Sequence, residues 1–258
     1  MAKAGSDVRI LCTSDTHCGS RWGLTPPDWQ NGTVRAWLDP FWKWWVALHK
    51  ELGSFDAHVH LGDSVDGQGD KERGIAELEL DVERQGDMAA EVLGVVKAAK
   101  HYLCFGTPYH SSGSHSYERH VARQLGATIE DTQYLRADGL RISARHVVSR
   151  SDTPYGQPGL VAKELIRDLL QAQQDDAPRA DIVLRGHVHT YAWIDNGMGY
   201  AGIVPCLQLP GGVFGRTQRP WWYRVGVLEL RIADGYCSQR PHLMTLRDVR
   251  RRRYATVG

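Results

Sequence analysis

The order of the predicted elements favours an α/β fold that contains a mixed β-sheet. In the first two-thirds of the chain, short apolar strands alternate with amphipathic helices, which is typical of α/β layers. In the last third, strand follows strand, with hairpin signals at Asn196-Gly197 and Asp234-Gly235. The 258 residues suffice for one large domain, and neither an internal repeat nor a low-complexity linker divides them. We therefore predict a single domain over residues 1–258.

Short apolar runs mark the strands, and apolar residues at helical spacing mark the helices. Asp39-Pro40 suits an N-cap followed by proline at the first helical position, and Gly53 suits the end of that helix. The predicted strands cover residues 8–13, 57–61, 102–105, 140–148, 182–184 and 225–231. The predicted helices cover residues 40–52, 74–100, 116–125 and 159–174.

The overall charge gives no sign of a nucleic-acid or membrane partner. Lysine and arginine total 31 against 30 aspartate and glutamate residues, so the formal net charge is +1. The exception is a basic C-terminal tail, residues 241–258, in which five arginines gather between positions 247 and 253. We interpret this tail first as solvated, and a contact with a phosphate backbone is the alternative.

The cysteines and the apolar runs indicate a compartment. Five cysteines are an odd number, and no Cys-x-x-Cys pair occurs, which argues against a disulfide framework and a structural zinc site. Residues 1–7 contain no apolar signal region, and no apolar run approaches the ~20 residues that span a bilayer. We therefore predict a reducing, cytoplasmic location and no membrane partner.

Tryptophan is unusually frequent, with nine residues, and four of them lie close together. These four fall in the first predicted helix, which is then too apolar to be fully exposed. The helix either packs inside the molecule or forms a homo-oligomer contact. The four residues are Trp37, Trp42, Trp44 and Trp45.

Polar clusters follow four of the predicted strands, at the point where each strand ends. In open α/β sheets, sites form beyond the carboxyl ends of the strands, so these clusters are expected to converge in space. Carboxylates together with imidazoles suit manganese, iron, zinc or nickel better than calcium. The clusters are Asp15-Thr-His17, Gly62-Asp63, Gly106 to His110, and Gly186-His187-Val-His189.

The order of these clusters resembles the calcineurin-like metallophosphoesterase family, whose pattern is Asp-x-His, Gly-Asp, Gly-Asn-His, a lone His and Gly-His-x-His. The match covers about residues 8–189 and includes His146 as the lone histidine. The stretch around the third block also resembles versions carried by phages. The resemblance implies a four-layer sandwich, with two mixed β-sheets face to face, flanked by helices. The β-rich remainder, residues 190–240, fits the second sheet.

The resemblance also implies two divalent metal ions, with manganese the first choice and iron, zinc or nickel the alternatives. Two such ions lie roughly 3.5–4 Å apart and clamp a phosphate oxygen between them. A bridging water becomes hydroxide near neutral pH and attacks phosphorus in line with the leaving oxygen. The implied ligands are Asp15, His17 and His189 for one ion, His146 and His187 for the other, and Asp63 as the bridge.

The third block departs from the family pattern. The family's asparagine ligates the second metal, and its neighbouring histidine protonates the leaving group. Here Thr107 stands in the asparagine's place, and His110 is displaced by two residues. His110 is therefore either the general acid or a replacement metal ligand, in which case His115 becomes the candidate acid. Both alternatives stay open, and His110 and Asp63 are the catalytic candidates.

Other polar residues near these motifs have simpler interpretations. His58 and His60 point to the same face of a strand and are interpreted as structural. A barrel amidohydrolase would use such a pair for metal, but no eightfold strand–helix rhythm is visible. Arg185 is interpreted as a solvated charge rather than a phosphate ligand, and Asp66 as a residue that orients a metal ligand.

The predicted function is metal-dependent hydrolysis of a phosphoester. A phosphodiester is the favoured substrate, with nucleic acid or a nucleotide as candidates. One alternative is a phosphomonoesterase. The other is a metal-binding scaffold that has lost catalysis through the altered third block.

Overall fold

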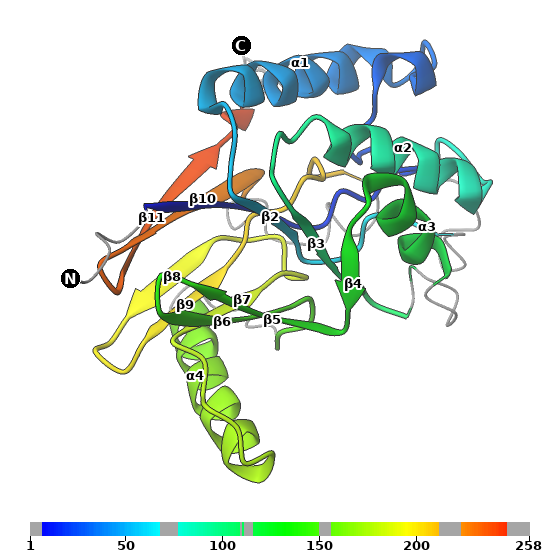
Figure 1. The fold of residues 1–258 in the computed structure, drawn as a ribbon. Coiled ribbons are helices and arrows are strands. Elements are labelled where there is room, and N and C mark those ends of the chain that lie inside the picture. The colour runs from blue at the N-terminus through cyan, green and yellow to red at the C-terminus, as the bar shows by residue number, and fades with distance from the viewer. Residues whose placement is uncertain are drawn as a thin grey trace, which may run out of the picture.

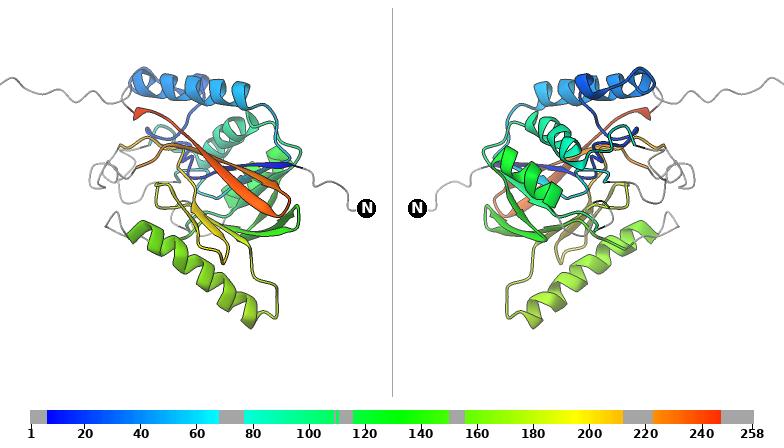
Figure 2. Two further views of the ribbon diagram at one scale, coloured as in Figure 1. Left: turned by 90° about the vertical axis from the view of Figure 1, so that its left-hand side faces the viewer. Right: turned by 90° about the vertical axis from the view of Figure 1, so that its right-hand side faces the viewer.

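The computed structural model describes residues 7–67, 77–108, 110, 116–149, 156–211 and 223–246. Within these residues, a six-stranded and a five-stranded β-sheet, both mixed, lie face to face (Figure 1). Helices α1, α2 and α3 lie outside the first sheet, and α4 lies outside the second (Figures 1 and 2). This arrangement confirms the predicted α/β sandwich.

The six-stranded sheet has the order β11-β10-β1-β2-β3-β4. Strands β1 to β4 are parallel, while β10 and β11 are antiparallel to their neighbours. The parallel strands therefore all end at one edge, where the first three predicted polar clusters follow them. The strands are β1 (Val8–Thr13), β2 (Ala57–His60), β3 (His101–Cys104), β4 (Thr128–Glu130), β10 (Gly226–Ala233) and β11 (Tyr236–Leu243).

The five-stranded sheet has the order β5-β6-β7-β9-β8. Its central strands β6, β7 and β9 are parallel, and antiparallel strands close both edges. The Asn196-Gly197 and Asp234-Gly235 hairpins form as predicted, between β8 and β9 and between β10 and β11. The strands are β5 (Thr132–Ala137), β6 (Leu140–Arg145), β7 (Ile182–Arg185), β8 (Ala192–Asp195) and β9 (Tyr200–Ile203).

Three apolar layers hold the sandwich together. The middle layer lies between the sheets and includes Cys12 and Val59 from one sheet and Ile142 and Leu184 from the other. Strands covered on both faces have continuous apolar runs, which is why the sequence predicts β1 and β7. A second layer lies between the first sheet and α1, α2 and α3, and a third lies between α4 and the second sheet.

Helix α1, Arg35–Leu52, begins five residues earlier than predicted. Pro40 lies inside the helix, so the prediction that Asp39 is its N-cap is wrong. A proline there removes a main-chain donor and is ordinarily unfavourable. The fully buried Phe41 and Trp45 on the inner face anchor this part of the helix to the core. Packing therefore outweighs the local helix-start signal.

The tryptophans of α1 pack inward, which is the first of the two predicted alternatives. The Trp45 indole N–H donates to the carbonyl of Val92 at 3.0 Å, and that of Trp37 donates to the carbonyl of Arg21 at 2.8 Å. Trp37 also stacks on Trp22, with ring centroids 5.0 Å apart. An oligomer contact through this helix stays a prediction.

Helix α2 is shorter than the predicted helix over residues 74–100. It spans Val82–Gly94, and the Asp81 carboxylate accepts hydrogen bonds from the main-chain N–H groups of Glu83 and Arg84 at 2.9 and 3.3 Å. This N-cap fixes where the helix begins, and residues 77–80 before it are not helical. The other two helices are α3 (Ser116–Leu125) and α4 (Gly156–Gln174).

Two further features differ from the sequence prediction. The sequence does not predict strands β4 and β5, because neither has an apolar run: β4 has no buried residue, and β5 mixes buried and exposed residues. The predicted tail from residue 241 begins too early, since residues 241–243 belong to β11. Its arginines lie outside the described residues.

No cysteine of the chain forms a disulfide, and all five lie in the described part. Four of them are buried and pack as small apolar residues. No helix among the described residues has both the length and the apolar character needed to cross a membrane.

Candidate metal centre

The predicted ligands come together where the parallel strands of both sheets end. Asp15 and His17 follow β1, Asp63 follows β2, and residues 187 and 189 follow β7. Main-chain hydrogen bonds join these turns: Asp15 N–H donates to the Gly62 carbonyl at 3.0 Å, and His17 N–H donates to the Asp63 carbonyl at 3.0 Å. The His187 N–H donates to the Asp15 carboxylate at 3.1 Å and so links the two sheets.

The backbone at this edge is unusual. Non-glycine residues rarely adopt a positive φ, and where several do so together the surrounding structure must hold them there. Eight described non-glycine residues have a positive φ, and five of them are predicted metal ligands. This clustering indicates that the turns aim side chains at a common point. The five are Asp15, His17, Asp63, His187 and His189, with φ of 54°, 44°, 51°, 73° and 50°.

One group of ligands gathers around Asp15. Its Oδ1 lies 3.2 Å from His189 Nε2 and 3.7 Å from His17 Nε2, and the two imidazole nitrogens are 3.2 Å apart. All three side chains are buried. These atoms are close enough to one another to share a single metal ion.

A second group gathers around Asp63. His146 Nε2 lies 2.9 Å from Asp63 Oδ2, and the rings of His146 and His187 have centroids 5.1 Å apart. These three side chains could also share one ion. His146 lies one residue beyond the end of β6, rather than inside a strand as predicted. The lone histidine of the sequence pattern is therefore brought to the centre by the second sheet.

The imidazoles are oriented by partners on their other nitrogen. His17 Nδ1 lies 2.8 Å from Asp66 Oδ1, which fits the orienting role predicted for Asp66. His189 Nδ1 lies 2.5 Å from the Tyr223 hydroxyl, and His146 Nδ1 donates to the Leu61 carbonyl at 2.5 Å. Such partners fix which nitrogen faces a metal. Tyr223 was missed in the sequence, because it comes from a distant segment and carries no local motif.

The two carboxylates are held in their charged form. Burial would raise the pKa of both, but the surrounding imidazoles outweigh it. His189 and His146 hold the pKa of Asp15 well below its usual range, and His146 and His110 do the same for Asp63. The centre therefore presents two anionic groups at neutral pH.

The histidines divide into two kinds. Burial would lower the pKa of His17, but Asp15 and Asp66 raise it to about 10. Burial acts likewise on His146, and Asp63 and Asp15 raise its pKa to about 9. Burial lowers the pKa of the two histidines that follow β7. In the absence of metal, two protons therefore occupy positions where a cation could bind.

One further observation indicates that these donor atoms suit a metal ion. Asp15 Oδ1 is buried and accepts no hydrogen bond, although imidazole nitrogens of His17, His189 and His146 lie 3.7, 3.2 and 4.0 Å away. A buried carboxylate oxygen without a hydrogen bond is unfavourable unless another group satisfies it. Carboxylate and imidazole donors suit a transition metal or zinc.

The altered third block lies beside Asp63. The Thr107 N–H donates to Asp63 Oδ1 at 2.7 Å, and the Thr107 hydroxyl donates to the same oxygen at 3.1 Å. His110 lies on the His17 side of the centre, with ring centroids 4.6 Å apart, and its Nε2 is 3.8 Å from Asp63 Oδ2. His110 can share an ion with His17 and Asp63. His115 lies outside the described residues.

Gly106 and Glu118 hold the third block in position next to Asp63. A β-carbon at Gly106 would come within 2.1 Å of Asp63 Oδ1, so only glycine lets the strands approach this closely. The Gly106 N–H donates to Glu118 Oε2 at 2.6 Å, and the Ser64 N–H donates to Oε1 at 3.1 Å. Burial and the nearby Asp63 raise the pKa of Glu118 to about 7. Glu118 thus joins the two turns that carry Asp63 and Thr107.

His58 and His60 are not part of any described ligand group. Both are fully buried, and the Thr13 hydroxyl lies 2.8 Å from His58 Nε2 and 2.9 Å from His60 Nδ1. This agrees with a structural role. Arg185 was predicted to be a solvated charge, and that prediction is wrong: it is buried and its Nε donates to Glu164 at 2.8 Å. Helix α4 covers the end of β7, where Arg185 lies, and so shields this arginine from water.

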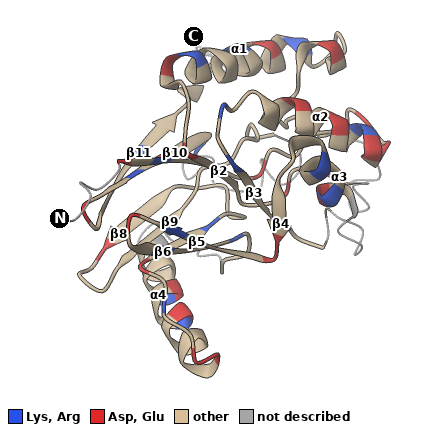
Figure 3. Ribbon diagram, viewed as in Figure 1, with Lys and Arg blue, Asp and Glu red and all other residues tan. Residues whose placement is uncertain are grey.

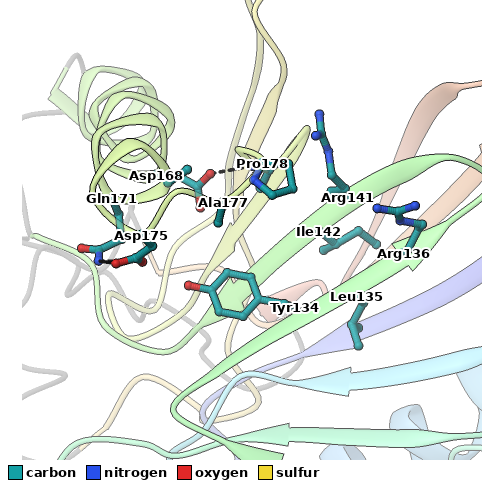
Figure 4. Close-up of a pocket in the computed structure, with 12 residues that line it drawn as sticks. Tyr134, Leu135, Arg136, Arg141, Ile142, Asp168, Gln171, Asp175, Ala177 and Pro178 are labelled. Carbon is teal, nitrogen blue, oxygen red and sulfur yellow. Dashed lines mark hydrogen bonds between the residues drawn. The ribbon is translucent and has the colours of Figure 1, made fainter.

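The charges on the helices and the cavities of the molecule bear on what could approach the centre. Both signs of charge are interspersed along α2 and α4 (Figure 3). One cavity of about 350 Å³ lies against the centre and is lined by His146 and Gly106. Another, of about 340 Å³, lies between α4 and β5–β6 and contains no predicted ligand (Figure 4). Of these two cavities, the first is the one that lies against the candidate ligands.

Comparison with known proteins gives limited support. No protein-family model and no curated protein matches the chain. Similar solved structures include Vps29 from Cryptosporidium parvum, with 10% identity, a TM-score of 0.46, and coverage of 93% of this chain and 98% of that one. A novel archaeal phosphodiesterase has 10% identity and a TM-score of 0.44, with coverage of 91% and 100%. A predicted phosphoesterase from Streptococcus pneumoniae has 12% identity and a TM-score of 0.41, with coverage of 93% and 100%. These scores are too low to support a function, which must rest on the centre itself.

Proposed function

We propose that the chain is a metal-dependent phosphoesterase that uses two divalent ions, with manganese the first choice, to hydrolyse a phosphodiester. The observation that carries the proposal is the convergence of two ligand groups, one around Asp15 and one around Asp63, on turns with left-handed backbone. Each group combines residues that follow strands of both sheets, and the two groups meet at one edge. Membership of the calcineurin-like family and its phage-type branch is part of the proposal.

When bound, the ions would polarise a phosphoryl oxygen and lower the pKa of water toward neutrality. Asp15, His17 and His189 would hold one ion and His146 and His187 the other. Asp63 would lie between them.

A residue of the chain itself, His110, would supply the proton that the leaving oxygen needs. The His110 Nδ1 lies 2.6 Å from the Asp66 carbonyl, and because a carbonyl only accepts, Nδ1 carries the proton. The Nε2 atom then faces the centre, 3.8 Å from Asp63, and it can deliver a proton there when the ring is an imidazolium with a proton on each nitrogen. His110 lies with His17 rather than with His146 and His187. We therefore propose it as the proton donor to the leaving oxygen rather than a replacement ligand of the second ion.

The decisive test combines metal analysis with activity. Purified protein loaded with Mn²⁺ should hold two ions per chain by elemental analysis. It should hydrolyse bis(p-nitrophenyl) phosphate faster than p-nitrophenyl phosphate. The opposite preference would favour a phosphomonoesterase. Two bound ions with no turnover of either ester between pH 5 and 9 would favour a binding scaffold without catalysis, and failure to bind metal would overturn both.

The role of His110 is tested separately. In H110A, retained metal with turnover about 100-fold slower on a poor leaving group, and much less affected on p-nitrophenolate, would support a proton donor. Loss of one ion would instead make His110 a ligand.

A further inference from the structure

The cavity of about 350 Å³ next to the candidate centre is lined by one of the candidate metal ligands. His146 lines it, and so does Gly106, which lies against the Asp63 carboxylate. A phosphoester bound at the centre would therefore extend its remaining parts into this space. The chemistry of the other lining residues indicates what those parts are.

Two arginines, Arg145 and Arg167, line the cavity. Arg145 immediately precedes His146 at the end of β6, and Arg167 lies on α4. Their side chains are 40% and 52% exposed, so both guanidinium groups can reach a ligand. One carboxylate, Asp131, also lines the cavity and offsets part of their charge.

Both arginines are held in place by one buried carboxylate. Glu164 is 1% exposed, and it accepts from Arg145 Nη2 at 2.9 Å, from Arg167 Nη1 at 2.5 Å and from Arg185 Nε at 2.8 Å. Three guanidinium cations around one carboxylate leave a surplus of two positive charges. Arg185 is itself buried, so it can neutralise Glu164 alone. The two exposed arginines are therefore more than the buried carboxylate requires.

A buried Glu164 that fixes two arginines is the kind of support that a binding site for an anion needs. Arginine forks match phosphate oxygens, and a guanidinium held by a second carboxylate loses little freedom on binding. The Arg145 Nε is buried and has no hydrogen-bond partner among the described residues. The arrangement is thus better suited to a second acceptor group than to stabilising the fold alone.

We infer that this cavity binds a second phosphate of the substrate, next to the phosphoester that is cleaved, through Arg145 and Arg167. This inference rests on the proposed function and narrows its substrate class to phosphodiesters that carry another phosphate one unit away. A terminal phosphate of a nucleotide and an internal phosphate of an oligonucleotide share this chemistry.

The test uses a matched pair of substrates with Mn²⁺-loaded protein. One is thymidine 5′-(p-nitrophenyl phosphate), and the other is the same compound with a 3′-phosphate. The 3′-phosphorylated compound should have at least a tenfold higher kcat/KM, and R145Q and R167Q should each reduce this preference about tenfold, as expected for loss of a charge-assisted hydrogen bond. A dinucleotide p-nitrophenyl ester distinguishes an internal phosphate from a terminal one.

Arg136 provides a matched control. It is an exposed arginine of the neighbouring strand β5 and lines the other cavity (Figure 4). R136Q removes the same charge and should leave the preference between the two substrates unchanged. An equal loss of preference in R136Q would show a general charge effect and overturn the inference.

A binding measurement separates this inference from the proposed function. Thymidine 3′,5′-bisphosphate should bind the protein by calorimetry at least tenfold more weakly in R145Q and R167Q than in the unchanged chain or R136Q. If no phosphoester is hydrolysed but this pattern holds, the proposed function fails and the phosphate site stands. If esters are hydrolysed but the two substrates are equal and the variants bind normally, the phosphate site is overturned and the function stands.

Discussion

The two sides of the candidate centre are built with different rigidity. On the side of Asp15, both imidazoles have a second partner from a distant segment, Asp66 for His17 and Tyr223 for His189. On the side of Asp63, His146 bonds to a backbone carbonyl, while the His187 ring makes no hydrogen bond to any described residue and is only partly buried. The first side is preorganised, and the second depends more on the ion itself.

The difference extends to the altered third block. The Thr107 hydroxyl and N–H both bond to Asp63, so threonine here holds the Asp63 carboxylate instead of offering a free oxygen. A site with fewer fixed donors binds its ion more weakly. The comparison therefore predicts a tight ion near Asp15 and an exchangeable one near His146.

The largest effect is expected from D63N, because it removes the charge shared by both sides. An amide cannot supply an anionic oxygen to two ions, so the variant should lose at least one ion and at least about a thousandfold in kcat. Elemental analysis and bis(p-nitrophenyl) phosphate turnover measure both. Full activity with two ions in D63N would show that the ligands are wrongly assigned.

The next effect compares the two sides directly. H187A should lower the affinity for one ion by more than about 100-fold and leave the other in place, since loss of a direct ligand exceeds the 10–100-fold effect of an outer partner. H17A should instead disturb the tight ion. Metal titration of both variants by calorimetry measures the affinity for each ion. If H187A weakens the tight ion and H17A weakens the exchangeable one, the predicted difference between the two sides is wrong.

The sequence predicts some of the residues on which these expectations depend and misses others. Asp15, His17 and Asp63 follow apolar runs that mark buried strands, so the sequence predicts both the strand and the candidate ligand. Tyr223 and Glu118 were not, because each acts through a contact with a segment more than 30 residues away. The start of α1 was misplaced for a similar reason, since the burial of Phe41 and Trp45 overrides the helix-start signal at Asp39-Pro40.

A third prediction concerns pH. The pKa of His17 is raised to about 10 and that of His146 to about 9 in the metal-free fold, so both carry protons at pH 7 that must leave when metal binds. Apparent affinity should rise by up to about tenfold per pH unit for each proton released. Calorimetry in buffers of different ionisation enthalpy counts these protons.

The same shifts give a sign for stability. A histidine whose pKa is raised in the folded state stabilises the fold. This contribution is complete below about pH 6.5, the pKa in the unfolded state, and it is lost as the pH rises toward 9–10. The Tm of the metal-free protein should therefore fall between pH 6.5 and 10, whereas excess Mn²⁺ should reduce the fall. A metal-free Tm that rises over this range would show that the two histidines are neutral.

The smallest effect tests how much preorganisation contributes on the Asp15 side. Y223F removes the hydroxyl that lies 2.5 Å from His189 Nδ1 and keeps the ring that packs edge-on against the imidazole at a centroid distance of 5.1 Å. Metal affinity should fall about tenfold, the lower end of the range for an outer partner, with the fold intact by circular dichroism. Y191F, which removes a hydroxyl bonded to Gln239 instead, is the control. If Y223F binds both ions as tightly as Y191F does, the rigidity of this side comes from its left-handed turns rather than from its hydrogen bonds, and the two sides should then differ less than the ligand contacts indicate.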